Sequence, residues 1–131
     1  MYIAALRRGE AIPAIRTLGS SVVWLSAVVL EELYAGADDR AHAAVKRLER
    51  DFDRAKRILL PNLRDWTQAG EVLARLADKY GYEDIARGRL TNDALIAMSA
   101  GRVGICVVTA NERDFRRLAE FRKFQWRVAV Q

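Results

Sequence analysis

Three short apolar runs, separated by long helical patterns, place the strongest constraint on the fold of this chain. The runs are Ser21–Leu25, Ile105–Thr109 and Trp126–Val130. Apolar runs of this length, rich in β-branched residues, are typical of strands that are buried on both faces. Strands that are separated by helices pair in parallel and are covered by those helices. The sequence therefore predicts one α/β domain over residues 1–131, with a short parallel sheet inside three layers.

Apolar residues at helical spacing, with capping residues at the segment ends, predict the other elements. The predicted helices are Ala27–Ala35 after the N-cap Ser26, Asp38–Arg57, Asp65–Tyr80, Asn92–Ala100, and a short helix from the N-cap Asn111 to Leu118. The helix Asp65–Tyr80 is expected to bury one side made of Trp66, Ala69, Val72, Leu73 and Leu76. Arg57–Leu60, which Pro61 stops, predicts one more short strand.

The counts of cysteine and histidine exclude several kinds of site. The chain has one cysteine, Cys106, and one histidine, His42, which excludes an internal disulfide, a thiolate zinc cluster and a multi-histidine metal site. Cys106 is expected in the core and His42 on an exposed helix face, so metal chemistry would have to use Asp and Glu oxygens. No apolar run approaches the roughly 20 residues of a membrane span, and no signal segment opens the chain. We expect a soluble, cytoplasmic protein.

The charge balance is basic. Lys and Arg number 22 against 17 Asp and Glu, for a net charge of +5, and 18 of the 22 cations are arginine. Guanidinium groups bind phosphates with paired hydrogen bonds, which favours a nucleic-acid partner. An arginine excess also follows from a GC-rich genome, so the charge alone leaves both explanations open.

Three acids lie where a site is expected to form. In open parallel sheets, sites form at the carboxyl ends of the strands. Glu32 lies early on the helix after the first run, Asp93 in the first turn of its helix, and Asp114 just after the run Ile105–Thr109. Carboxylates gathered from separate elements repel one another, and Mg²⁺ or Mn²⁺ would neutralise them while accepting a substrate phosphate. Such ions orient water and stabilise the leaving oxygen in phosphodiester hydrolysis.

Each of these acids also has a purely structural explanation. Asp93 and Asp114 sit near helix N-termini, where the helix dipole favours an acid. Asn111 followed by Asp114 is close to a capping-box spacing, and Glu32 resembles its neighbour Glu31 as a solvated helix residue. The spacing by itself leaves both explanations open.

Three motifs occur in register along the chain. They are Ser26-Ala-Val-Val-Leu-Glu-Glu-Leu-Tyr-Ala-Gly-Ala, Leu90-Thr-Asn-Asp-Ala-Leu-Ile-Ala and Val108-Thr-Ala-Asn-Glu-Arg-Asp-Phe. Together they closely resemble the PIN-domain ribonucleases, specifically the VapC-type toxins of bacterial and archaeal toxin–antitoxin pairs. The resemblance runs from about Met1 to the C-terminus. It implies a PIN-like fold, magnesium-dependent cleavage of structured RNA such as tRNA or rRNA loops, a homodimer, and inhibition by a VapB-type antitoxin.

The resemblance also implies roles for single positions. Glu32, rather than Glu31, matches the family's helix glutamate because it immediately precedes Leu33. The matching catalytic and metal-binding acids are then Glu32, Asp93 and Asp114, and the matching polar residues of the pocket are Thr109 and Asn111. Beside them, we predict that Arg113, Arg116 and Arg117 bind RNA phosphates, because they share a short helix with Asp114. The alternative is that these arginines only solvate a helix face.

The start of the chain departs from the family pattern, in which a short apolar strand ends in a metal-binding aspartate. Met1–Arg8 has the apolar pattern of the middle or end of a helix, Pro13–Leu18 that of a short helical stretch, and no Asp precedes Glu10. We therefore expect the first central strand and one of four acidic ligands to be missing, through a start codon placed too late, a shortened sequence or true loss. A partner strand would be able to fill the exposed slot.

Two functions of different classes follow. The first is a metal-dependent endoribonuclease toxin of a type II toxin–antitoxin pair, using Mg²⁺ or Mn²⁺ and weakened by the missing ligand. The second is a catalytically silent PIN domain that binds RNA or an antitoxin, an alternative that the missing aspartate keeps open. A structural domain whose acids are only helix caps is disfavoured, because three motifs occur together.

Overall fold

A parallel sheet organises the fold. The computed structural model of the chain describes residues 2–4, 22–83 and 89–129. The strands are β1 (Tyr2–Ala4), β2 (Val23–Ser26), β3 (Ile58–Leu59), β4 (Cys106–Thr109) and β5 (Trp126–Val128), in the sheet order β3-β2-β1-β4-β5. The helices are α2 (Ala27–Gly36), α3 (Asp39–Arg54), α4 (Leu63–Tyr80), α6 (Arg89–Val103) and α7 (Glu112–Ala119). The predicted α/β class with a short parallel sheet flanked by helices is confirmed.

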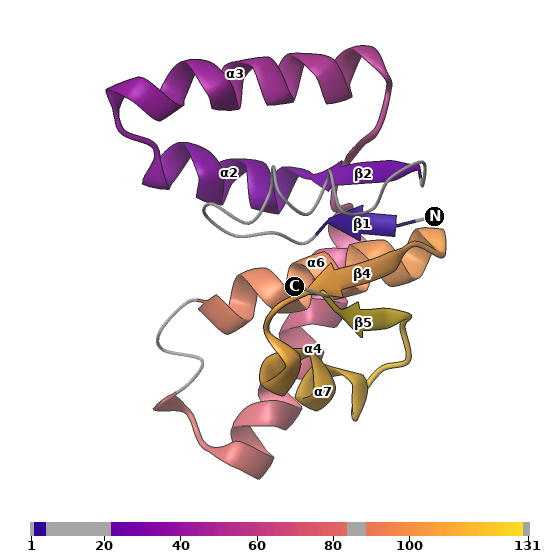
Figure 1. Cartoon of the computed structure of the whole chain (residues 1–131). Helices are drawn as coiled ribbons and strands as arrows, with labels where there is room; N and C mark the ends of the chain where they lie inside the picture. Colours follow the sequence, from indigo (N-terminus) through magenta and orange to yellow (C-terminus); the bar gives the residue numbers. More distant parts are fainter. Residues whose placement is uncertain (1, 5–21, 84–88, 130–131) are drawn as a thin grey trace.

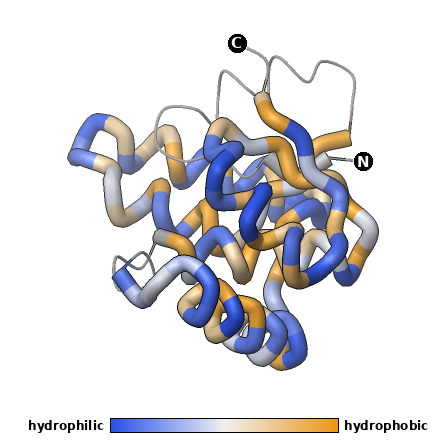
Figure 2. Tube along the Cα trace, turned by 90° about the horizontal axis from the view of Figure 1, so that it is seen from below, coloured by the Kyte–Doolittle hydropathy of each residue, from blue (hydrophilic) through white to orange (hydrophobic). Residues whose placement is uncertain are grey.

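The helices divide into two groups. Figure 1 shows that α2 continues from β2 and forms an antiparallel pair with α3 at one edge of the molecule. The other three helices lie around β4 and β5, where α4 packs against α6, and α7 contacts both β5 and α6. In Figure 2, hydrophobic and hydrophilic positions alternate along the helical turns, as expected for helices with one buried face.

The first strand corrects the prediction for the start of the chain. At Tyr2–Ala4, the described part of Met1–Arg8, the expected helix is wrong, and so is the expected loss of the central strand, because β1 lies between β2 and β4. Ile3 is paired with Trp24 on one side and with Val107 on the other. A run of a few apolar residues suits a buried strand and a buried helix equally well, and here pairing on both sides satisfies the strand's backbone groups. The stretch Pro13–Leu18 lies outside the described residues.

Several helix ends differ from their predicted positions for local reasons. α3 ends at Arg54 rather than Arg57, because Lys56 has a φ of 56° and turns the chain toward β3. α4 begins at Leu63 because Asn62 and Asp65 form a reciprocal capping box, with both hydrogen bonds 2.9 Å long. α6 extends beyond Asn92–Ala100 at both ends, starting at Arg89. The predicted N-cap Ser26 is confirmed, and its hydroxyl accepts the Val28 N–H at 3.2 Å.

α6 is the central helix of the core. Its buried apolar residues lie on nearly every side of the helix, and they are Leu90, Ala94, Leu95, Ile96, Ala97, Met98 and Ala100. Ser99 is also fully buried, and its hydroxyl donates to the Leu95 carbonyl at 2.7 Å. A helix that is apolar all round is surrounded by the rest of the domain. Any acid on α6 is therefore held rigidly.

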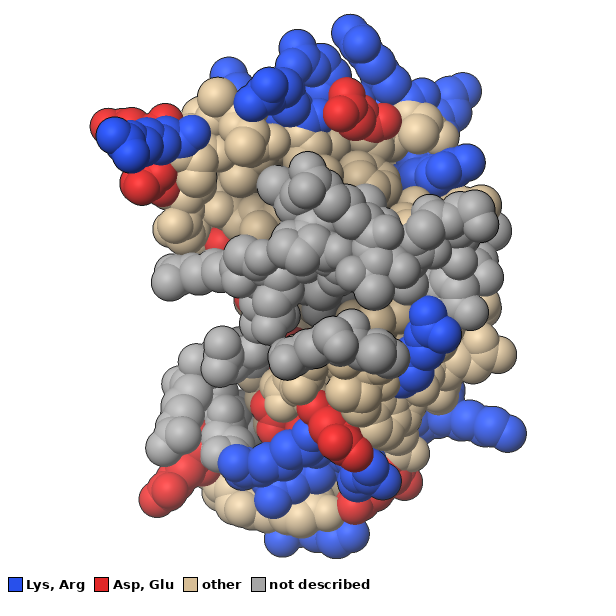
Figure 3. Space-filling view, viewed as in Figure 1, with Lys and Arg blue, Asp and Glu red and all other residues tan. Residues whose placement is uncertain are grey.

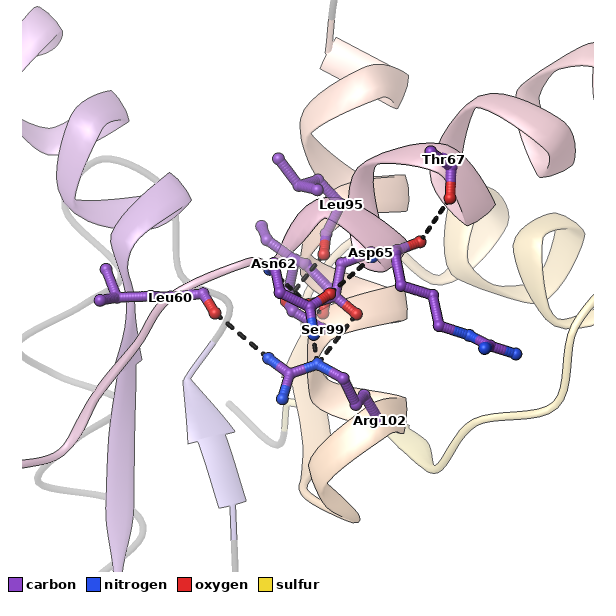
Figure 4. Close-up of polar contacts among 9 residues, drawn as sticks. Leu60, Asn62, Asp65, Thr67, Leu95, Ser99 and Arg102 are labelled. Atoms are coloured by element: carbon purple, nitrogen blue, oxygen red, sulfur yellow. Dashed lines mark hydrogen bonds and ion pairs between the residues drawn. The ribbon is translucent and has the colours of Figure 1, made fainter.

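On α4, Asp65 is buried and Trp66 is exposed, whereas the sequence predicts that Trp66 is buried. Trp66 is 57% exposed, so its predicted place on the buried side is wrong, while Asp65 is fully buried. Figure 4 shows Arg102 of α6 beside it. Its Nε donates to both Asp65 carboxylate oxygens at 3.1 and 3.0 Å, and its Nη2 donates to the Leu60 carbonyl at 3.2 Å. This ion pair joins α4, α6 and the segment that follows β3.

The one histidine lies where the sequence predicts it, and the one cysteine is less buried than predicted. His42 is exposed on α3, as predicted. Cys106 is half-buried at the start of β4 rather than fully in the core, and burial raises the pKa of its thiol, while Arg127 nearby lowers it less. None of the helices within residues 22–83 and 89–129 combines the length and the apolar character that crossing a membrane requires.

Candidate active site

Two acids from different helices share one hydrogen-bond donor. The Asn111 side-chain Nδ2 donates to Asp93 Oδ2 at 3.1 Å and to Asp114 Oδ2 at 2.8 Å. Asp93 comes from α6 and Asp114 from α7, and the two are 21 positions apart in the sequence. The amide therefore sits between two carboxylates that would otherwise repel each other.

The end of β4 places this donor. Thr109 is the last residue of β4 and is buried, and its hydroxyl accepts the backbone N–H of Asn111 at 3.0 Å. Asn111 is the N-cap of α7, and its amide oxygen faces the Asp114 N–H at 3.4 Å. Because the amide oxygen faces the helix, the amide nitrogen is directed at the two carboxylates. Thr109, Asn111, Asp93 and Asp114 thus form one hydrogen-bonded group at the carboxyl end of this strand.

Asp93 lies deeper in its helix than expected. The sequence predicts it in the first turn, but α6 begins at Arg89, so Asp93 belongs to the second turn. The helix dipole acts mainly within the first turn, which weakens the explanation of Asp93 as a simple helix-start acid. Asp93 is also only 2% exposed. A buried carboxylate is costly unless charge or hydrogen bonds compensate it, and the Asn111 amide supplies one such hydrogen bond to Asp93. Asp114 lies in the first turn of α7, as predicted.

Glu32 approaches from the other side of the sheet centre. Glu32 lies on α2, which follows β2 directly. Because β2, β1 and β4 run parallel, α2 starts at the carboxyl-end edge of the sheet, which is also the edge where β4 ends beside Asp93 and Asp114. Glu32 is half-buried with a buried Oε1 oxygen, whereas Glu31 is exposed, which agrees with the choice of Glu32. Within the described ranges, no three Asp, Glu, His or Cys side chains are grouped closely enough to hold one metal ion. The structure joins Asp93 and Asp114, and it does not join Glu32 to them in a three-carboxylate group.

The strand at the centre of the sheet brings no acid to this edge. β1 ends at Ala4, the sequence continues with Ala5, Leu6 and Arg7, and the next acid along the chain is Glu10. The strand expected to be missing is therefore present, and the acid expected at its end is absent from the sequence that follows it.

Two of the three arginines of α7 contact neighbouring side chains that the structure describes. Arg116 pairs with Glu112 one helical turn earlier, and its guanidinium carbon lies 5.8 Å from the centre of the Trp126 ring. The Arg117 guanidinium lies 4.1 Å above the ring of Tyr80, a stacking geometry that the sequence did not reveal. Arg113 is exposed. Figure 3 shows basic and acidic side chains interspersed over α7, below the strands.

The ring that holds Arg117 belongs to a further cluster. The Tyr80 hydroxyl donates to the Glu120 carboxylate at 2.7 Å, and Lys79 pairs with the same carboxylate at 2.8 Å. The hydrogen bonds from Lys79 and Tyr80 lower the pKa of Glu120, and the bond to Glu120 raises the pKa of Lys79. In the sequence, the one sign of this cluster is Tyr80 in the last turn of α4, and aromatic residues are too common at that position to indicate such a cluster.

The chemistry of the donor set fits a hard divalent cation. Mg²⁺ is usually held by one or two carboxylates, together with water and substrate phosphates. Asp93 and Asp114 supply two adjacent carboxylates, and the side-chain amide of Asn111, which is neutral, donates to both of them. Among the described side chains, the site contains no thiolate or imidazole that would favour a softer metal.

Comparisons with known proteins identify the family and the fold of this chain. The sequence model of the PIN domain matches residues 2–121. The crystal structure of DNA-bound VapBC from Salmonella typhimurium has a chain that is 26% identical, with a TM-score of 0.63, covering 89% of this chain and 85% of that one. The structure of FitAB bound to an IR36 DNA fragment has a chain that is 18% identical, with a TM-score of 0.65, covering 98% and 95%. No curated protein sequence matches.

Proposed function

This chain belongs to the PIN-domain family, and from that premise we propose that it is a metal-dependent endoribonuclease toxin of a type II toxin–antitoxin pair. PIN-domain proteins are generally nucleases. The observation that carries the proposal is the sharing of one donor by Asp93 and Asp114 at the carboxyl end of β4. Two carboxylates in contact with one amide are more than helix capping requires, since Asn111 alone caps α7.

Each side chain has a distinct role in this proposal. Asp93 and Asp114 hold Mg²⁺ or Mn²⁺ with their carboxylate oxygens, and Asn111 with Thr109 keeps the two carboxylates oriented. Glu32 adds negative charge at the same edge of the sheet. A bound divalent ion supplies activation of water and stabilises the charge that develops on the phosphodiester. Arg113, Arg116 and Arg117 hold RNA phosphates beside the reacting one.

The similar solved structures also suggest partners for this chain. The solved VapBC and FitAB structures are toxin–antitoxin complexes, and the VapBC chain resembles this one over most of its length. We propose a VapB-type antitoxin as partner, a homodimer as the assembly, RNA as the substrate and the cytoplasm as the location. Co-expression with a neighbouring small gene and sedimentation of the purified chain test the first two.

A second candidate function is favoured by the sequence after β1. No acid lies between that strand and Glu10 in the sequence, so the residues that directly follow β1 carry no carboxylate that would add to Asp93 and Asp114. A domain with this deficit would bind RNA or an antitoxin without cutting. The two functions differ in one measurable property, the cleavage of RNA that depends on a divalent metal.

Metal binding by the native chain is expected to be weak and to improve when an acid follows β1. Affinity for a hard divalent ion rises with the number of carboxylates that compensate its charge, so Ala5→Asp should tighten Mn²⁺ binding by at least about tenfold. Mn²⁺ titration by electron paramagnetic resonance or calorimetry measures this change. RNA cleavage with Mg²⁺, Mn²⁺ or EDTA should follow the same order.

The control places the same charge elsewhere. Ala43→Asp adds an acid to an exposed position of α3 and should leave Mn²⁺ affinity unchanged. Equal affinities for Ala5→Asp and the native chain would contradict the site assignment. Native protein that binds RNA but cuts none with either metal, while Ala5→Asp does cut it, would establish the second function.

Removal of an α7 arginine is expected to weaken RNA binding in a salt-dependent manner. Each lost phosphate contact should flatten the slope of log affinity against log salt by about 0.7 for single-stranded RNA. Arg116→Ala is the cleaner variant, because the Arg116 side chain is 66% exposed and its partners among the described residues are its helix neighbour Glu112 and the Trp126 ring. Arg117→Ala also removes the stacking on Tyr80, so its unfolding midpoint must be measured alongside. Unchanged slopes in both variants would move the RNA path away from α7.

A further inference from the structure

A second group of charged side chains lies at the far end of α6 from Asp93. Nine positions separate Asp93 from Arg102 on this helix, which corresponds to about 13 Å along its axis. Around Arg102, the first turns of α4, the last turns of α6 and the segment 122–124 enclose a cavity of about 230 Å³. This cavity shares no lining residue with the candidate active site.

Positive charge predominates in this cavity. Its lining bases are Arg64, Arg102, Arg122 and Lys123. Among the described lining residues the one acid is Asp65, which is fully buried, and both its oxygens are engaged by Arg102 Nε. Oδ2 of Asp65 also accepts the Asn62 N–H, as part of the capping box. Asp65 therefore compensates Arg102, and three further cations remain without a carboxylate among the described residues of the cavity.

Two of these cations converge on a neutral group. With its amide oxygen turned toward them, Gln68 accepts hydrogen bonds from Arg64 Nε at 2.9 Å and from Arg122 Nη2 at 2.6 Å. Like charges that are brought together raise the free energy of the folded state unless an anion compensates them. In the described part of the chain, neither arginine forms an ion pair. The guanidinium groups of Arg64 and Arg122 are therefore already placed together as donors for an anion.

The segment that carries Arg122 and Lys123 is anchored to the core. Phe124 packs edge-on against the buried Phe115, with ring centres 6.1 Å apart. It also approaches α6 so closely that a Cβ at Gly101 would lie 3.2 Å from the Phe124 Cβ. Glycine at this position permits the approach, so the two bases are held in place rather than carried on a loose loop.

We propose that this cavity binds a phosphate group. Arg64 lies on α4, and Arg122 and Lys123 lie on the segment 122–124, so these three cations reach the cavity from two sides. Donors from different directions suit the tetrahedral oxygens of phosphate better than the two coplanar oxygens of a carboxylate. A volume of about 230 Å³ accommodates a phosphate with its water and is small for a larger organic ligand. The group is either a backbone phosphate of RNA or free phosphate. Neither source requires that the acidic site be catalytic.

The test follows the arginine side chains by nuclear magnetic resonance. Inorganic phosphate is titrated at constant ionic strength while the Nε–Hε signals of the arginines are recorded. The signals of Arg64 and Arg122 should shift and saturate, and both Arg64→Gln and Arg122→Gln should weaken phosphate binding at least tenfold. Both arginines are exposed, so these variants should fold, and the amide spectrum verifies this. Arg50→Gln, an exposed position on α3 with the same loss of charge, should bind phosphate as the native chain does.

Three results would overturn the proposal. They are shifts that never saturate, equal phosphate affinities in Arg122→Gln and Arg50→Gln, or an equal response to acetate, which would indicate an acidic peptide. A second arm identifies the source by measuring the salt dependence of RNA binding. A slope flattened by about 0.7 in Arg122→Gln, but not in Arg50→Gln, assigns the site to RNA. If Arg122→Gln leaves the salt slope of RNA binding unchanged while the native chain binds phosphate, the site is assigned to free phosphate. Either result supports a phosphate site.

Discussion

Replacing Asp93 with asparagine should reduce metal-dependent RNA cleavage by about 100- to 1000-fold. Stabilisation of phosphoryl charge by a metal ion is worth several kcal/mol, and each 1.36 kcal/mol is tenfold in rate. Asparagine keeps an oxygen that can accept the hydrogen bond from Asn111 but loses the charge that holds the cation. Initial rates of cleavage of a fluorescent RNA, measured over a range of Mn²⁺ concentrations, give the comparison. Asp114→Asn should behave alike, since both acids contact the same amide.

The control for this experiment is Asp78→Asn, an exposed acid on α4 that should leave the cleavage rate unchanged. Thermal unfolding of each variant separates loss of the site from loss of the fold, which matters because Asp93 is only 2% exposed. A folded Asp93→Asn variant that retains more than about a tenth of the native rate would remove Asp93 from the catalytic group.

Arg102→Met should lower the free energy of unfolding by about 3 kcal/mol, the lower end of the effect of breaking a buried ion pair. Methionine retains most of the aliphatic packing of arginine, so the loss reports mainly on Asp65, whose carboxylate is fully buried and would keep only its contact with the Asn62 N–H. For a domain of this size, the unfolding midpoint should fall by about 10 °C. Urea and thermal unfolding followed by circular dichroism measure both quantities.

A second ion pair that involves α4, the helix of Asp65, provides the control. Lys79 pairs with Glu120 at 2.8 Å, but these side chains are 55% and 35% exposed. Lys79→Met should therefore lower the midpoint far less than Arg102→Met. The double variant Asp65→Asn with Arg102→Met should recover part of the stability, because it leaves no buried charge. Equal losses in Arg102→Met and Lys79→Met would show that the buried pair contributes no more than an exposed one.

Local signals predicted the elements best. Ser26 and Asn111 cap the helices that the sequence assigns to them, because a capping side chain bonds to backbone only two or three residues away. Gly81 ends α4 as expected, with a φ of 96° that glycine adopts easily. Thr109, Asn111 and Asp114, which the family resemblance implies for one pocket, lie within a few positions of one another at the end of β4.

The features that the sequence did not predict depend on residues far apart in the chain. The apolar pattern at β1 predicts a helix, because the strand's partners in β2 and β4 begin about 20 and 100 residues later, where no local pattern shows them. The burial of Asp65 depends on Arg102, which is 37 residues away. The joint contact of Asn111 with two acids required the relative positions of α6 and α7, and the distance of Glu32 from that group required the position of α2.

The central place of β1 has a consequence for how the chain acquires its structure during synthesis. Ile3 is paired with Val107, so the middle of the sheet joins residues 104 positions apart. At translation rates of about 5–20 residues per second, β1 waits on the order of 5–20 s before β4 has been made. Contacts between such distant segments also slow folding itself, because the long loop must close first. Asn111 and Asp114 follow β4 in the chain, so the acidic group assembles only when nearly the whole domain has been translated.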